Sequence, residues 1–163
     1  MIWGFIRIVV KVGTSTLTNE NGKTDLRAFD RLALVLSDVQ NMGYEVILVS
    51  SGAIAVGANK LNAKERPTSL RMKQAAAAVG QCSIMHLYDK FFEDYDKTIA
   101  QILLNADDIE QEEKKENLTN TFNALLETGI IPVVNAAPPQ TCVHTSYYRD
   151  YSVFNSHHES YRH

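Results

Sequence analysis

The stretch that decides the fold class is Ile6-Arg7-Ile8-Val9-Val10-Lys11-Val12-Gly13. Its side chains are β-branched and apolar apart from Arg7 and Lys11, a pattern typical of a strand inside a sheet. Gly13 closes the strand, and the polar residues 14–23 follow, with a turn expected at Asn21-Gly22. This part of the chain is therefore a buried strand that leads into a polar, glycine-containing loop.

Strand and helix patterns alternate along the rest of the chain. Four segments have the composition of strands, namely residues 6–12, 45–50, 98–104 and 130–134. Apolar residues at helical spacing fill the intervals between them, at residues 26–39, from 53 onward, 67–92 and 121–128. In the long third helix, the alanine run 75–78 and Gly80 suit close packing against a neighbouring element.

This alternation predicts an α/β fold with three layers, in which helices cover both faces of a mainly parallel sheet. A chain of 163 residues that is 45% hydrophobic is long enough for one domain with a core. Ligands bind such sheets beyond the carboxyl ends of the strands. The candidate functional loops are therefore residues 11–15, 50–53 and the chain from Asn135 onward.

The first candidate loop is Lys11-Val12-Gly13-Thr14-Ser15. A lysine at a strand end can pair its ammonium with phosphate oxygens, and Gly13 lets the backbone approach a ligand closely. The amides and hydroxyls of Thr14 and Ser15 can donate hydrogen bonds to phosphate. The alternative is a lysine that extends from a strand end beside an ordinary turn.

The second candidate loop is Ser50-Ser51-Gly52-Ala53, which leads from the second strand into a helix. Its free N–H groups and the positive end of the helix dipole favour an anion, such as the carboxylate of a substrate. The alternative is a serine that only caps the N-terminus of the helix.

Several classes of protein and of site are excluded. The net charge of −3 gives no reason to expect nucleic acid or an anionic membrane as a partner, and no apolar segment approaches the roughly 20 residues of a membrane span. Residues 52–57 have the glycine spacing of a P-loop, but Ala58-Asn59 stands where Lys-Ser/Thr is required. The dinucleotide fingerprint and the G-x-S-x-G elbow of hydrolases are missing as well.

No metal site is expected. The acidic residues 107–116 are interpreted as a solvated loop or the start of a helix. Cys82 and Cys142 form no disulfide framework, and Cys82 is expected to be a buried thiol within a helix. A reduced, cytoplasmic setting follows as the default.

Several motifs in order resemble the amino acid kinase family. They are Val10-Lys11-Val12-Gly13-Thr14-Ser15, Val49-Ser50-Ser51-Gly52-Ala53-Ile54, Ala77-Ala78-Val79-Gly80-Gln81, Gln101-Ile102-Leu103-Leu104 and Ile131-Pro132-Val133-Val134-Asn135. The last three narrow the resemblance to members that phosphorylate the γ-carboxylate of L-glutamate with ATP and Mg²⁺, in the first step of proline synthesis. The resemblance covers about residues 6–135, so residues 1–135 are assigned to the N-terminal part of the family's domain.

The resemblance also implies roles for individual residues. Lys11 is expected to neutralise charge on the transferred phosphoryl group as the catalytic residue, and Gly13, Thr14 and Ser15 to bind the ATP phosphates. Ser51, Gly52, Ala53 and Asn135 are expected to bind glutamate. Oligomerisation of the chain with itself is a further possibility. Another member of the family, such as an acetylglutamate, carbamate or uridylate kinase, and a non-catalytic module that binds an anion or a protein partner both stay open.

The sequence departs from the family's pattern after the fourth strand. Asn135 is followed by Ala136-Ala137-Pro138, where the family has Glu-Asn-Asp with an aspartate that contacts the substrate. Residues 136–163 contain no Leu, Ile, Lys, Met or Gly, yet hold four of the five histidines and four of the seven tyrosines. We expect either an irregular or disordered tail, or a departure from the natural sequence, and favour the second. The nucleotide-binding half of the family's domain has no counterpart, so little or no kinase activity is expected.

Overall fold

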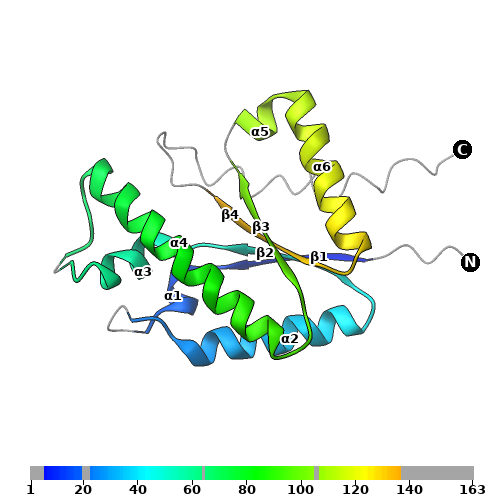
Figure 1. Cartoon of the computed structure of the whole chain (residues 1–163), viewed down its shortest axis with the longest axis horizontal. Coiled ribbons are helices and arrows are strands. Elements are labelled where there is room, and N and C mark those ends of the chain that lie inside the picture. Colours follow the sequence, from blue (N-terminus) through cyan, green and yellow to red (C-terminus); the bar gives the residue numbers. More distant parts are fainter. Residues whose placement is uncertain (1–5, 20–22, 64, 105–106, 137–163) are drawn as a thin grey trace, which may run out of the picture.

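The computed structural model describes residues 6–19, 23–63, 65–104 and 107–136. The strands are β1 (Arg7–Val12), β2 (Glu45–Ser50), β3 (Ile99–Leu104) and β4 (Ile131–Ala136). The helices are α1 (Thr14–Leu17), α2 (Leu26–Asn41), α3 (Ala53–Lys60), α4 (Leu70–Glu93), α5 (Asp107–Glu110) and α6 (Glu112–Glu127). Strands and helices therefore alternate as the sequence predicts (Figure 1).

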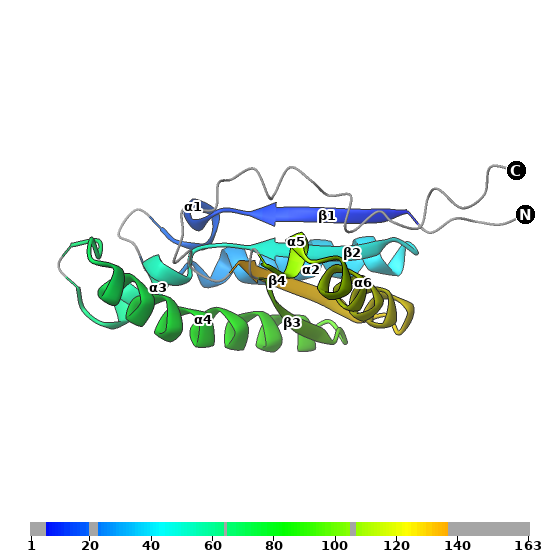
Figure 2. The same ribbon diagram turned by 90° about the horizontal axis from the view of Figure 1, so that it is seen from above.

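The four strands form one parallel sheet in the order β1-β2-β4-β3 (Figure 2). The two central strands are the most buried, β2 from Val46 to Ser50 and β4 from Ile131 to Asn135. At the carboxyl end, Val12 of β1 pairs with Ser50 of β2, and Ser50 pairs with Asn135 of β4. The ends of three strands therefore lie at the same level, where a ligand site is expected in a parallel sheet.

Helices cover both faces of the sheet, so the expected three-layer α/β/α architecture is confirmed. On one face, helices α2, α3 and α4 pack on alternate strand residues around a core of buried apolar side chains (Val12, Leu17, Phe29, Ala33, Leu36, Val46, Leu48, Val56, Ile84, Tyr88, Phe92, Ile131 and Val133). On the other face, Phe122 and Leu126 of α6 pack on the intervening strand residues (Ile47, Val49, Ile102 and Val134). Figure 1 shows α6 and α2 on opposite sides of the strands.

Helices α3 and α4 approach each other at backbone distance. A Cβ atom on Gly57 would overlap the carbonyl oxygen of Ala76, and one on Gly80 would overlap the carbonyl oxygen of Ala53. Only glycine at both positions lets the two helices cross this closely. The first turn of α3 is therefore fixed to the middle of α4, as the alanine run and Gly80 predict.

Helices α2 and α4 each begin directly after a residue whose side chain caps the N-terminus of the helix. The Asp25 carboxylate accepts hydrogen bonds from the N–H groups of Arg27 and Ala28 at 3.0 and 3.2 Å. The Ser69 hydroxyl accepts from the N–H of Met72 at 3.4 Å, so the long helix starts directly after the residues predicted to open it.

Several expectations need correction. Residues 14–17, expected in a polar loop, form the short helix α1, because Leu17 is fully buried in the core and anchors that turn. The acidic residues 107–116 were expected in a solvated loop or the start of a helix, and the second alternative is confirmed by α5 and the first turns of α6. Strand β4 runs to Ala136 rather than Val134, since it stays paired with β3 to that point. Cys82 lies in α4 as expected, but it is exposed rather than buried.

Other predictions lie outside the described residues. These are the turn at residues 21–22, Cys142, and the composition-based prediction for the tail beyond Ala136. Within the described ranges, none of the helices has the length and apolar content needed to cross a membrane.

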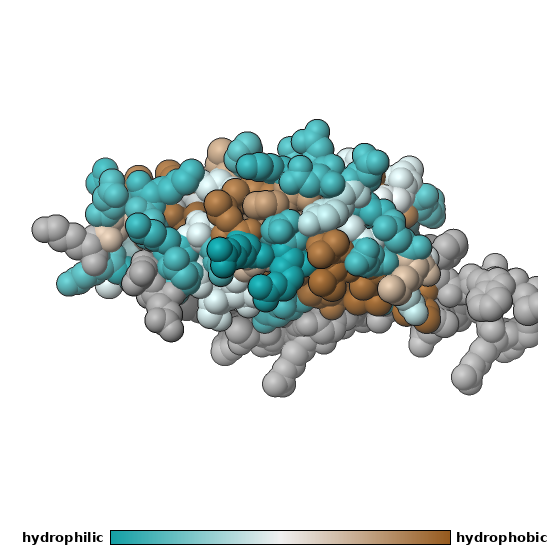
Figure 3. Space-filling view, turned by 90° about the horizontal axis from the view of Figure 1, so that it is seen from below, coloured by the Kyte–Doolittle hydropathy of each residue, from teal (hydrophilic) through white to brown (hydrophobic). Residues whose placement is uncertain are grey.

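Large apolar side chains are exposed at the sheet edges and on α2. Ile6 beside β1 and Leu103 on the edge strand β3 are 61% and 56% exposed. Leu34 and Val35 are exposed on α2, and apolar patches lie between hydrophilic ones on the underside of the molecule (Figure 3). An uncovered apolar edge is unusual for a parallel sheet, which is normally buried.

Candidate active site

The two loops predicted from the sequence lie side by side at the carboxyl end of the sheet. The Ser51 N–H donates to the carbonyl oxygen of Val12 at 3.1 Å, and the Ser51 hydroxyl donates to the same oxygen at 3.0 Å. Two hydrogen bonds to one acceptor fix the start of the second loop on the end of β1. The candidate phosphate and substrate loops are thus one connected structure.

Gly52 is the N-cap of α3 and has φ of +109°. This left-handed conformation is costly for any residue with a Cβ atom. A Cβ on Gly52 would also lie 3.4 Å from the Cα of Thr14, so Gly52 brings the helix start against the first loop. The alternative that Ser51 caps α3 is wrong, because Gly52 occupies that position and α3 has no side-chain cap.

The first N–H groups of α3 are consequently not capped by a side chain. The hydrogen bonds of the helix begin with Val56, whose N–H donates to the carbonyl of Gly52 at 3.0 Å. The N–H groups of Ala53 and its neighbours precede that bond, at the positive end of the helix dipole. This end of α3 can hold a carboxylate or phosphate.

The first loop leaves space at its glycine. Gly13 has an ordinary φ of −83°, and a Cβ built on it would meet nothing within 4 Å. The backbone conformation therefore does not require glycine here, while the open space lets a ligand reach the backbone. Thr14 is half-buried and Ser15 is exposed beside it.

Lys11 lies on the other face of the sheet from Asn135, the one predicted substrate residue that belongs to a strand. Successive strand residues point to opposite faces. Arg7, two pleats earlier in β1, donates to the Asn123 side chain of α6 at 3.3 Å, which places the odd residues of β1 on the α6 face. Lys11 is exposed there, whereas Ser50 and Asn135 face α4. The structure thus brings Ser51, Gly52 and Thr14 together, with Lys11 across the sheet edge.

Asn135 is 6% exposed at the end of β4, and its Nδ2 donates to Oε1 of Gln81 on α4. Its neighbour in the register, Ser50, bonds Tyr88 of α4, with 2.9 Å between the two hydroxyl oxygens. Burial raises the pKa of Tyr88 to about 12, and the Ser50 hydrogen bond opposes that rise. Tyr88 therefore stays neutral at physiological pH.

Neither Gln81 nor Tyr88 was assigned to the site from the sequence. Gln81 stood within a motif of the resemblance, and Tyr88 follows it by seven residues, which is two helical turns. That spacing puts two polar side chains on the same face of the helix, the one that packs on the sheet mainly through apolar residues. It is the signal that could have found them.

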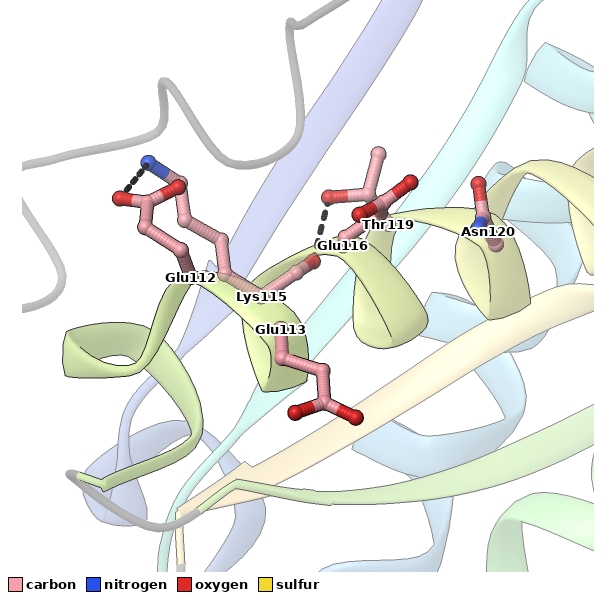
Figure 4. Close-up of a pocket in the computed structure, with 6 residues that line it drawn as sticks. All are labelled: Glu112, Glu113, Lys115, Glu116, Thr119 and Asn120. Carbon is pink, nitrogen blue, oxygen red and sulfur yellow. Dashed lines mark hydrogen bonds and ion pairs between the residues drawn. The ribbon is translucent and has the colours of Figure 1, made fainter.

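A surface depression on α6 is separate from this edge. It is lined by residues of that helix alone (Glu112, Glu113, Lys115, Glu116, Thr119 and Asn120) (Figure 4). Lys115 pairs with Glu112 at 3.9 Å, so the remaining carboxylates leave the depression acidic. An acidic, open surface does not suit a nucleotide phosphate or a dicarboxylate.

Mg²⁺ prefers carboxylate and phosphate oxygens as ligands. The residues assigned to the site from the sequence (Lys11, Gly13, Thr14, Ser15, Ser51, Gly52, Ala53 and Asn135) include none with a carboxylate. No cluster of metal-ligating side chains occurs among the described residues either. This part of the site therefore does not supply a protein-held Mg²⁺.

The parallel sheet and the two connected loops at its carboxyl edge define a class of α/β proteins, and the chain belongs to the amino acid kinase family, which it matches over residues 7–145. The chain is 58% identical over 129 residues to a protein of Clostridium perfringens named glutamate 5-kinase, which covers 79% of this chain and 48% of that protein. Proteins of the same name from Enterococcus faecalis and Listeria innocua are each 54% identical over 129 residues, covering 79% of this chain and 48% and 47% of those proteins. The chain thus spans about half the length of these relatives.

Proposed function

We propose that this chain forms the substrate side of the active site of a kinase that transfers the γ-phosphoryl group of ATP to the γ-carboxylate of L-glutamate. The product of that reaction is glutamyl 5-phosphate, the first intermediate of proline synthesis. Support comes from the name that the related proteins share and from the order of motifs along residues 6–135.

The observation that carries the proposal is the uncapped N-terminus of α3, held against the β1 loop by Ser51. Glutamate is a dicarboxylate, and the amides of Gly52 and Ala53 with the helix dipole suit one of its carboxylates. The Ser51 hydroxyl donates to Val12 and keeps its lone pairs as acceptors for a second contact.

Lys11 and the Gly13 loop form the phosphate-facing part of the proposed site. In this reaction, the γ-carboxylate of glutamate attacks the γ-phosphorus of ATP. The bond between that phosphorus and the β–γ bridging oxygen breaks, and ADP leaves with the electron pair of that bond. No protein nucleophile is needed, so the protein contributes positioning and charge neutralisation. The Lys11 ammonium and the amides and hydroxyls around Gly13 supply both.

The chain alone is proposed to have little or no kinase activity, because it spans about half the length of its relatives. The wild-type chain is compared with the Clostridium perfringens relative in an assay of glutamate-dependent ADP release. A rate more than a hundredfold below that of the relative supports the proposal. A rate near that of the relative contradicts the proposal that the chain forms only the substrate side of the active site.

The acceptor is tested in the same way against the other family substrates. Binding of L-glutamate is compared with that of N-acetylglutamate, carbamate and uridine monophosphate by calorimetry. Tighter binding of L-glutamate supports the assignment, whereas a preference for another acceptor would assign the chain to that branch of the family. The role of Lys11 is tested by binding of inorganic phosphate, which is expected to weaken in Lys11→Met and to stay unchanged in the control Lys115→Met, because Lys115 belongs to the depression on α6 and not to the residues assigned to the site.

A further inference from the structure

Helix α4 contacts the sheet mainly through apolar side chains, but two of its polar side chains reach the ends of the central strands. Gln81 accepts a hydrogen bond from Asn135 of β4, and Tyr88 bonds Ser50 of β2. Ser50 and Asn135 are register partners. Helix α4 therefore holds the Ser50 and Asn135 side chains at the strand ends where the candidate substrate loop begins.

The contact with Gln81 fixes which way the Asn135 amide faces. A side-chain amide has a donor nitrogen and an acceptor oxygen at opposite ends. Because the Gln81 Oε1 can only accept, it holds the Nδ2 of Asn135 toward α4. The Oδ1 of Asn135 is therefore the end left for a ligand. An oxygen acceptor suits an ammonium group and disfavours a carboxylate.

The described residues satisfy only one end of the Gln81 amide. Its Oε1 accepts from Asn135, while its Nε2 is buried and has no hydrogen-bond partner among the described residues. A methionine would avoid the cost of that unmade hydrogen bond, but it would leave the buried Nδ2 of Asn135 without an acceptor. The stabilising part of this contact is therefore the part that holds the Asn135 amide.

We propose that Gln81 is a positioning residue that orients the Asn135 amide, so that Oδ1 of Asn135 accepts a hydrogen bond from the α-ammonium of an amino-acid substrate. The identity of that substrate rests on the function proposed above. Gln81 then determines specificity, because it favours glutamate over glutarate, the same dicarboxylate without the amino group.

The test uses the full chain with the variants Gln81→Met, Gln81→Glu and Asn135→Ala, titrated with L-glutamate and with glutarate by ¹⁵N NMR. Gln81→Met is expected to weaken L-glutamate binding about tenfold, the value of one hydrogen bond, and to leave glutarate binding unchanged. Gln81→Glu keeps an oxygen acceptor for Asn135 and is expected to keep the preference. Asn135→Ala is expected to lose it.

Unfolding in urea separates orientation from a merely structural role. Gln81→Met leaves the Nδ2 of Asn135 without its acceptor and is expected to be less stable than the wild type, as is Ser69→Ala, which removes the cap of α4 and is expected to keep the wild-type ratio of glutamate to glutarate affinity. A wild-type ratio of glutamate to glutarate affinity in Gln81→Met would overturn the proposal. If the wild-type chain binds neither ligand, the proposed function fails. The role of Gln81 is then tested without a ligand, by the NMR signals of the Asn135 side-chain amide. A change in their chemical shifts between the wild type and Gln81→Met supports the orienting contact, and unchanged shifts overturn it.

Discussion

Ser51 makes two hydrogen bonds to the carbonyl oxygen of Val12, one from its backbone N–H and one from its hydroxyl. This carbonyl ends β1, and Ser51 begins the loop that leads to α3. The position of the helix start relative to the first loop therefore depends on one side chain. The following predictions test that dependence and the packing that supports it.

Ser51→Ala removes the hydroxyl bond and leaves the backbone bond. We expect the free energy of unfolding to fall by about 1 kcal/mol and L-glutamate binding to weaken at least tenfold. Ser69→Ala is the matched control, because it removes the cap of α4 at a similar cost in stability. Urea unfolding and calorimetry measure the two effects, and equal loss of glutamate binding in both variants would contradict the role of Ser51.

Gly52→Ala and Gly13→Ala separate backbone strain from ligand access. Gly52 has φ of +109°, so an alanine there is expected to destabilise the fold by about 1–2 kcal/mol. Gly13 has φ of −83° and open space, so an alanine there is expected to leave stability unchanged or slightly higher. Binding of inorganic phosphate should weaken in Gly13→Ala. Equal destabilisation by the two variants in urea unfolding would refute this account.

Gly80→Ala sets helix propensity against packing. Propensity alone predicts stabilisation by about 1 kcal/mol, since alanine is the better helix former. The added Cβ would overlap the Ala53 carbonyl, so we expect destabilisation by about 1–3 kcal/mol or more and loss of glutamate binding as α3 moves. Thermal unfolding gives the sign directly, and a stabilised variant would rule out the close helix contact.

Ionisation of Tyr88 is expected to lower the free energy of unfolding at high pH. Burial raises its pKa from 10.0 to about 12, so the neutral form is favoured in the folded state. The resulting stability is fully present below pH 10 and is lost as the pH rises through 12, by up to about 3 kcal/mol. Urea unfolding between pH 8 and 12 measures this loss.

Tyr88→Phe is expected to abolish the part of the pH dependence that comes from Tyr88, and to cost about 1 kcal/mol at pH 8, because Ser50 loses its partner. Tyr95→Phe is the control. A hydrogen bond to Asp30 raises the pKa of Tyr95, but this tyrosine lies at the surface, where solvent screens the effect. The same pH profile in Tyr88→Phe and wild type would exclude Tyr88 as its source.

The strands and long helices could be predicted from the sequence because their signals are local. Alternation of β-branched runs with helical spacing gave the parallel three-layer fold, and Ser69 marked the start of α4 by its capping side chain. The short helix α1 was missed, because its one strong determinant is the burial of Leu17 against distant residues. A helix of four residues is too short to show the periodic spacing of apolar residues by which a helix is predicted.

The site was only partly predictable. A glycine loop that leads into a helix was predicted at Gly52 and Ala53, and the structure has that arrangement, while the binding of an anion there stays a prediction. The contact between Gln81 and Asn135 joins residues 54 positions apart. Such a pairing depends on how α4 crosses the sheet, which no local pattern contains. The position of Lys11 on the α6 face likewise follows from the register of β1 and not from its motif.

The most direct test of the central claim is a pair of calorimetric titrations of the wild-type chain, one with L-glutamate and one with ATP. The account predicts that L-glutamate binds at the edge formed by Ser51, Gly52 and Asn135, that Ser51→Ala weakens this binding, and that ATP binds far more weakly or not at all. Tight ATP binding without glutamate binding would contradict it, and binding of neither ligand would leave the chain without the proposed half-site.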